Sequence, residues 1–129
     1  MTTSDLPADG QPDVSAEGTE APFDDVITLS TSTEDGVVTV TVVGEVDTFT
    51  APVLRSTLDS QLEQSPPELV IDLSGVQFLG SAGLAVLVET QKSARSREVA
   101  LRLIATTRAV TRPLEVTGLI DLFTIADAR

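Results

Sequence analysis

Residues 69–90 read LVIDLSGVQFLGSAGLAVLVET, and this stretch decides the fold. Residues 69–73 are apolar on both faces apart from Asp72, a pattern typical of a central strand in a largely parallel sheet. Residues 81–95 place apolar side chains at helical spacing, which predicts a helix that begins at Ser81. A hydroxyl at a helix start lies in front of unpaired backbone N–H groups, where an anion or a covalent phosphate is favoured. We therefore interpret Ser81 as a candidate phosphorylation site on a small protein-binding module.

The flanking sequence predicts an α/β domain in which strands and helices alternate. The predicted strands cover residues 26–29, 37–43, 69–73, 99–104 and 119–125. The predicted helices cover residues 48–64, 81–95 and 111–117. Residues 30–36 are polar and end in Asp35-Gly36, which predicts a turn. Strands joined through helices predict right-handed crossovers and a mixed, mostly parallel sheet covered by helices.

Two loops of the predicted domain are expected to converge on one edge of the sheet. In such sheets, binding residues gather where the carboxyl ends of strands meet helix N-termini. The loops are residues 44–48 and 74–81, which places Asp47 and Thr48 near Ser81. Structural alternatives remain open: Ser81, Asp47 and Thr48 are also good helix-capping residues. Gly83 is small enough to let a helix start approach a neighbouring loop.

The composition excludes most common enzyme chemistries. The chain has 129 residues, of which 41% are hydrophobic, which suits one domain with a modest aliphatic core. It contains no Cys, so disulfides, thiol catalysis and thiolate metal sites are excluded. Because His is also absent, a His-containing triad and an imidazole metal ligand are excluded. We therefore expect a protein that is not an enzyme and has no metal or other cofactor.

The N-terminal residues 1–25 differ in composition from the rest of the chain. They hold seven Asp and Glu residues and no Lys or Arg, which predicts a disordered acidic tail ahead of a domain over residues 26–129. Without these seven residues, 13 acidic and 8 basic residues remain, a net charge of −5 against −12 for the whole chain. The tail has two open interpretations, a solubilising leader or a docking or autoinhibitory segment.

The acidic balance also bears on partners and location. A net charge of −12 argues against nucleic acid or an anionic membrane surface as a partner. The chain has no apolar run of about 18 residues and no basic-then-apolar leader. A cytoplasmic location is the resulting expectation.

Three spaced motifs resemble those of a known family. They are residues 44–47 (GEVD), 70–79 (VIDLSGVQFL) and 80–84 (GSAGL), with a weaker match at residues 117–119 (TGL). In this order they resemble the STAS domain, and in particular the anti-sigma factor antagonists of bacteria. The resemblance extends over residues 37–125 and leaves the acidic tail unexplained.

The resemblance implies a phosphorylation-controlled partner switch. In the family, the unphosphorylated protein binds an anti-sigma factor with a serine kinase fold, which releases a sigma factor and so regulates transcription, for example in a stress response. The anti-sigma factor phosphorylates the motif serine, which is Ser81 here, and a serine phosphatase reverses this step. The implied partner-binding residues are Asp47, Thr48, Gly80, Ser81, Ala82, Gly83 and Leu84.

The motif departs from the family at two positions. Gly80 stands where the family usually has Asp, so a carboxylate beside the phosphoacceptor is missing. Ala82 stands where the family has Ser or Thr, which leaves Ser81 as the only acceptor within the motif.

Two other functions remain open from the sequence. One is a STAS scaffold or accessory subunit of another assembly, such as a signalling complex or a lipid-transport ATPase, in which Ser81 is not phosphorylated. The other is a nucleotide-binding or hydrolytic protein that uses the helix start as a phosphate site. The G-x-x-x-x-G-K-S/T motif is absent, which argues against the second alternative.

Overall fold

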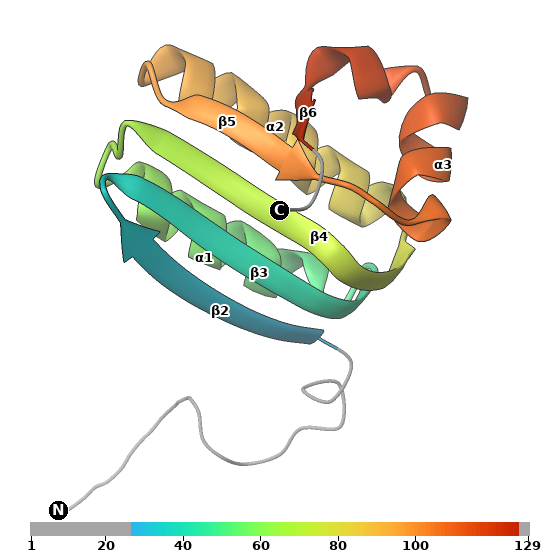
Figure 1. Cartoon of the computed structure of the whole chain (residues 1–129). Helices are drawn as coiled ribbons and strands as arrows, with labels where there is room; N and C mark the ends of the chain where they lie inside the picture. The colour runs from blue at the N-terminus through green and yellow to red at the C-terminus, as the bar shows by residue number, and fades with distance from the viewer. Residues whose placement is uncertain (1–26, 127–129) are drawn as a thin grey trace, which may run out of the picture.

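The computed structural model of the chain describes residues 27–126 (Figure 1). The predicted tail, residues 1–25, lies outside the described residues. The strands are β2 (Ile27–Glu34), β3 (Val37–Val46), β4 (Glu68–Leu79), β5 (Ala100–Ile104) and β6 (Thr124–Ala126). The helices are α1 (Ala51–Leu62), α2 (Ser81–Ser96) and α3 (Arg108–Val116), followed by the 3-10 helix η2 (Leu119–Leu122). The predicted alternation of strands and helices is confirmed.

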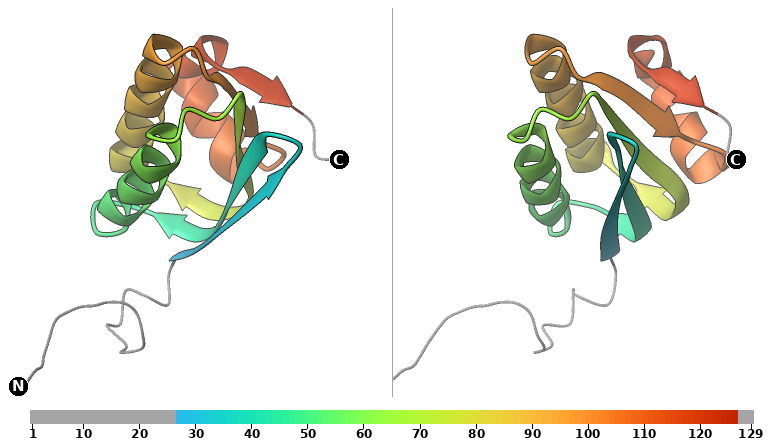
Figure 2. Two further views of the ribbon diagram at one scale, coloured as in Figure 1. Left: turned by 90° about the vertical axis from the view of Figure 1, so that its left-hand side faces the viewer. Right: turned by 60° about the vertical axis from the view of Figure 1, so that its left-hand side comes forward.

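Within the described residues the strands form one mixed sheet in the order β2-β3-β4-β5-β6. Strand β2 is antiparallel to β3, whereas β3, β4, β5 and β6 run parallel to one another. Figure 2 shows α1 and α2 side by side on one face of the sheet, and α3 packs against β4 apart from this pair. This arrangement confirms a mixed, mostly parallel sheet with helical connections.

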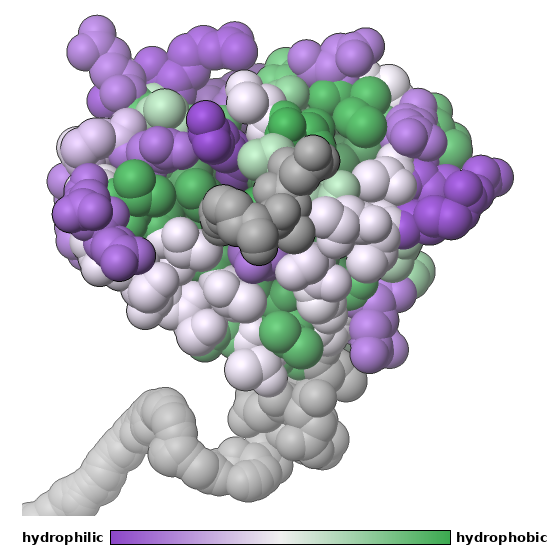
Figure 3. Space-filling model, viewed as in Figure 1, coloured by the Kyte–Doolittle hydropathy of each residue, from purple (hydrophilic) through white to green (hydrophobic). Residues whose placement is uncertain are grey.

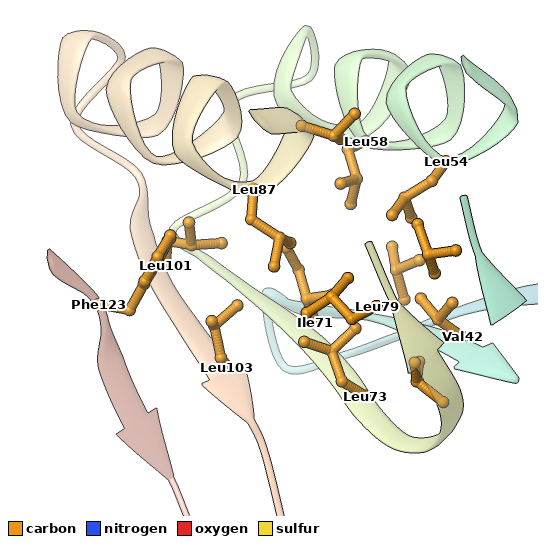
Figure 4. Close-up of a cluster of buried hydrophobic side chains, with 14 of the residues drawn as sticks. Val42, Leu54, Leu58, Ile71, Leu73, Leu79, Leu87, Leu101, Leu103 and Phe123 are labelled. Carbon is orange, nitrogen blue, oxygen red and sulfur yellow. The ribbon is translucent and has the colours of Figure 1, made fainter. Parts of the chain in front are cut away.

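The core lies between this helix pair and the sheet. Figure 4 shows Leu54 and Leu58 of α1, and Leu87 of α2, pointing toward Ile71 and Leu73 of β4. All five side chains are fully buried. Burial of each such branched aliphatic side chain stabilises the fold by roughly 1.5–3 kcal/mol. The core is therefore aliphatic, as the composition predicts.

The first strand is longer than the sequence pattern suggests. Residues 30–34 belong to β2 and pair with β3, from Ser30 opposite Thr41 to Glu34 opposite Val37. The prediction that these residues are a turn is wrong, because an edge strand exposed to solvent needs no apolar side chains. Figure 3 shows this face over β2 and β3 mainly in white, the colour of weakly polar residues.

Strand β4 also extends beyond its predicted end. Residues 74–79 continue the strand to Leu79 instead of forming a loop. The pairing with β3 shifts register between Thr41 and Val43 and again between Gly44 and Glu45. Such bulges keep two strands paired although their apolar patterns lose strict alternation, so the pattern alone predicts too early an end.

The boundaries of three later elements also differ. Helix α1 begins at Ala51, three residues after the predicted start. Helix α3 begins at Arg108, three residues before the predicted start, and Pro113 lies inside it. The single strand predicted for residues 119–125 is instead η2 followed by β6.

Candidate functional site

The ends of β3 and β4 lie side by side and form the candidate site. Val46, the last residue of β3, pairs with Leu79, the last residue of β4. The N–H of Gly80 donates a hydrogen bond of 2.9 Å to the carbonyl oxygen of Val46. Asp47 and Ser81 directly follow these joined strand ends. The expected convergence of the two segments on one sheet edge is therefore confirmed.

A closed set of hydrogen bonds holds the turn between β3 and α1. The Asp47 Oδ1 atom accepts from the N–H of Phe49 at 2.9 Å and from that of Thr50 at 3.0 Å. The buried Thr50 hydroxyl donates to the carbonyl of Glu45 at 2.8 Å and accepts from the N–H of Asp47 at 2.9 Å. Thr50 holds the N-cap position of α1, so Asp47 orders the turn instead of capping the helix. These hydrogen bonds hold the turn between β3 and α1 in one defined conformation.

These contacts also fix the charge of Asp47. The hydrogen bond from the Thr50 N–H holds the pKa of the Asp47 carboxyl below its usual range. Desolvation acts in the opposite direction, and the hydrogen bond from the Phe49 N–H lowers the pKa further. Asp47 is therefore a carboxylate at neutral pH. A fixed negative charge lies beside the start of α2.

Ser81 is the first residue of α2 and is exposed. Gly80 holds the N-cap position, so Ser81 does not cap the helix, and its hydroxyl forms no hydrogen bond within residues 27–126. The first helical bond runs from the Leu84 N–H to the Gly80 carbonyl at 3.0 Å. Among the described residues, the N–H groups of Ser81, Ala82 and Gly83 donate to no backbone carbonyl. An accessible hydroxyl thus lies beside free helix N–H groups.

The remaining predicted site residues divide into surface and interior positions. Thr48 is exposed and Ala82 is half-buried, so both can present atoms at the surface. Gly83 and Leu84 are buried, and Leu84 belongs to the core. These two residues position the helix start instead of facing solvent.

Gly83 explains how α2 begins so close to the sheet. A Cβ atom at this position would lie 2.6 Å from Cγ1 of Val46 and 2.7 Å from Cδ1 of Leu79. Since a side chain there would force these buried neighbours to shift, the interpretation of Gly83 as a close-approach residue is confirmed. Because Gly83 has no side chain, the first turn of α2 lies close to the joined ends of β3 and β4, and Ser81 lies there with it.

Two exposed aromatic residues at this edge were not predicted as site residues. Phe49 lies in the Asp47 turn and Phe78 lies two residues before Gly80, with 74% and 50% of their surfaces exposed. Among residues 27–126 only one other aromatic is present, Phe123, and it is buried. The sequence carried a weak signal for them, since aromatic residues are scarce and these two flank the motif residues.

Other kinds of site find little support in the described residues. Residues 27–126 contain no group of three Asp or Glu side chains placed to hold a metal ion, and no helix among them is long and apolar enough to span a membrane. A shallow cavity of about 240 Å³ lies between α2 and β5, lined in part by Arg95 and Arg102. Arg95 lies in the last turn of α2, where it complements the helix dipole, and Arg102 pairs with Glu68 at 3.1 Å.

The family model of the STAS domain matches residues 28–129, so the chain belongs to the STAS domain family. Its relatives include the anti-sigma-F factor antagonist RsfB of Mycobacterium tuberculosis, with 34% identity over 77% of this chain and 80% of that protein. The anti-sigma-B factor antagonist of Staphylococcus aureus is 29% identical over 74% of this chain and 89% of that protein. Both names describe regulatory proteins and not enzymes.

A solved structure agrees with these relatives. The crystal structure of an anti-sigma factor antagonist from Mycobacterium paratuberculosis superimposes with a TM-score of 0.76 and 39% sequence identity. The match covers 85% of this chain and 92% of that one. The STAS fold predicted from the motifs is confirmed, and the chain is similar to anti-sigma factor antagonists over most of their length.

Proposed function

We propose that this protein is an anti-sigma factor antagonist whose binding is switched off by phosphorylation of Ser81. The unphosphorylated protein binds an anti-sigma factor with a serine kinase fold in the cytoplasm and thereby releases a sigma factor. The observation that carries the proposal is the exposed Ser81 hydroxyl at the start of α2, beside the fixed Asp47 turn. Relatives named as anti-sigma factor antagonists support the same function.

The proposed switch acts through charge. A phosphate on Ser81 adds about −1.5 to −2 charges at neutral pH. The first turn of α2 contains no acidic residue, and its free N–H groups and helix dipole stabilise a negative charge, so the fold is retained. A partner pressed against Ser81 must instead remove water from a dianion, at a cost of several kcal/mol. The carboxylate of Asp47 adds like charge at the same edge and increases this cost.

Binding to a purified anti-sigma factor of the serine-kinase-fold class tests the proposal. Wild type and Ser81→Ala are expected to bind, whereas Ser81→Glu is expected to lose binding while its circular dichroism spectrum stays unchanged. Ser60→Glu, which adds the same charge at an exposed position of α1, is the matched control and is expected to bind like the wild type. Equal binding by Ser81→Glu and the wild type would refute the switch.

Intact mass after incubation with the anti-sigma factor and ATP tests the phosphorylation itself. One added phosphate is expected on the wild type and none on Ser81→Ala, and a serine phosphatase is expected to remove it. A wild type that binds its partner but gains no phosphate would favour the alternative, a STAS scaffold or accessory subunit without phosphorylation.

A further inference from the structure

Phe78 is an exposed aromatic side chain near the end of strand β4. Half of its surface is accessible, whereas Leu79, the next residue, is almost fully buried. Aromatic side chains that fill a pocket of the partner near the centre of an interface commonly carry much of the binding energy. The position of Phe78 in the fold is well defined, because it lies opposite Glu45 in the β3–β4 pairing.

The ring of Phe78 is seated on Gly80. A Cβ atom at Gly80 would lie 3.0 Å from Cε2 and 3.3 Å from Cζ of the Phe78 ring. The backbone of Gly80, with φ −90° and ψ −178°, is extended and accessible to any residue. A side chain at residue 80 would therefore require the Phe78 ring to shift by a few tenths of an ångström, whereas the backbone conformation itself sets no requirement for glycine.

Phe49 provides a second exposed ring on the neighbouring segment. Its N–H donates to Asp47 Oδ1 at 2.9 Å, so the backbone that carries the ring is fixed. Little backbone conformational entropy is then lost when a partner covers the side chain, because the turn is already ordered. Phe49 and Phe78 extend from the two segments that the Gly80 to Val46 hydrogen bond joins.

The charge of the two segments that carry Phe49 and Phe78 indicates which charge a complementary partner surface must have. Residues 43–50 and 74–85 carry two carboxylates, Glu45 and Asp47, and no Lys or Arg. Glu45 is exposed, and as the register partner of Phe78 it presents its side chain on the same face of the sheet. A complementary partner surface is apolar at its centre and cationic at its border.

We propose that Phe78, seated on Gly80, and Phe49 are the apolar anchors that recognise the anti-sigma factor, and that Gly80 sets specificity by leaving room for the Phe78 ring. The partner surface that receives them is an apolar pocket bordered by Lys or Arg, which faces Glu45 and Asp47. This inference rests on the proposed function, since it names the contacts of the same site.

Affinity measurements with the same purified anti-sigma factor test the anchors. Phe78→Ala and Phe49→Ala are each expected to weaken binding by about tenfold or more, which is typical of an interface anchor. Val116→Ala is the control, because Val116 is an exposed apolar residue on α3, outside the two segments of the site, and it is expected to leave affinity unchanged. Urea denaturation of each variant verifies that the fold is retained.

A double-mutant cycle tests the role of Gly80. Gly80→Ala displaces the ring and is expected to weaken binding in the wild-type background but to have no further effect in Phe78→Ala. Glu45→Gln is expected to reduce the salt dependence of binding, since it removes one of the charges that face the cationic border.

The outcomes separate this inference from the proposed function. If Ser81→Glu abolishes binding while Phe78→Ala and Phe49→Ala bind like the wild type, the switch stands and the anchors are wrong. If Gly80→Ala weakens binding equally with and without Phe78, the specificity role of Gly80 is wrong. If the wild type itself binds no anti-sigma factor of this class, the proposed function fails.

Discussion

Replacing Gly83 by Ala sets two opposite effects against each other. Ala is favoured over Gly inside a helix by about 1 kcal/mol. The added methyl group, however, would lie 2.6 Å from Val46 and 2.7 Å from Leu79, well inside the roughly 3.5–4.0 Å at which carbon atoms attract. Both neighbours are buried in a packed core and cannot move freely. Overpacking of this kind costs about 1–3 kcal/mol.

We expect the steric cost to exceed the helix gain, so Gly83→Ala lowers the free energy of unfolding by up to about 2 kcal/mol. Urea denaturation measures this change, and an unaltered m-value would verify that the compactness of the two states is unchanged. Ala85→Gly is the matched control, because Ala85 is an exposed residue of the same helix. It reports helix propensity alone and is expected to cost about 1 kcal/mol.

The sign of the change in unfolding free energy caused by Gly83→Ala shows which of the two effects is larger. If Gly83→Ala is more stable than the wild type by about 1 kcal/mol, helix propensity prevails and the first turn of α2 is not held against the strand ends. The explanation for how Ser81 is placed at the joined edge would then be refuted. A destabilised Gly83→Ala with native secondary structure would support it.

Two further predictions concern the Asp47 turn. Thr50→Val keeps the shape of the buried side chain but removes its hydrogen bonds to the Asp47 N–H and the Glu45 carbonyl, so it is expected to lower the free energy of unfolding by about 1–3 kcal/mol in urea denaturation. A loss below about 0.5 kcal/mol would contradict the role of Thr50. Because folding lowers the pKa of Asp47, its contribution to stability is present above the unfolded-state value of about 3.9 and is lost as the pH falls through the folded-state value. The stability difference between the wild type and Asp47→Asn is therefore expected to change below about pH 4, whereas a difference that stays constant down to about pH 2 would rule out a lowered pKa.

Local patterns in the sequence predicted several elements well. The helix that begins at Ser81 was predicted at its observed start, because its apolar spacing and its boundary are both local features. The Asp35-Gly36 turn is confirmed by φ angles of 55° and 83°, which these two residue types adopt more readily than others. Such features depend on residues a few positions apart and are readable without knowledge of the fold.

The lengths of β2 and β4 were not readable in this way. Residues 30–34 are strand only because β3 offers them hydrogen-bonding partners, and residues 74–79 remain strand across two shifts of register. Pairing of this kind depends on distant residues, so polar or irregular segments resemble loops in sequence.

The sequence by itself determined the parts of the candidate site: a hydroxyl at a helix start, an acidic turn ahead of another helix, and the absence of His and Cys. These properties follow from residue chemistry and local spacing. Only the tertiary structure decided that Gly80 bonds to Val46, that Gly83 and Leu84 are interior, and that Phe49 and Phe78 are exposed. Burial and strand pairing are set by residues far apart in the chain, and the same phenylalanine side chain is a core residue or a surface anchor according to what the fold places beside it.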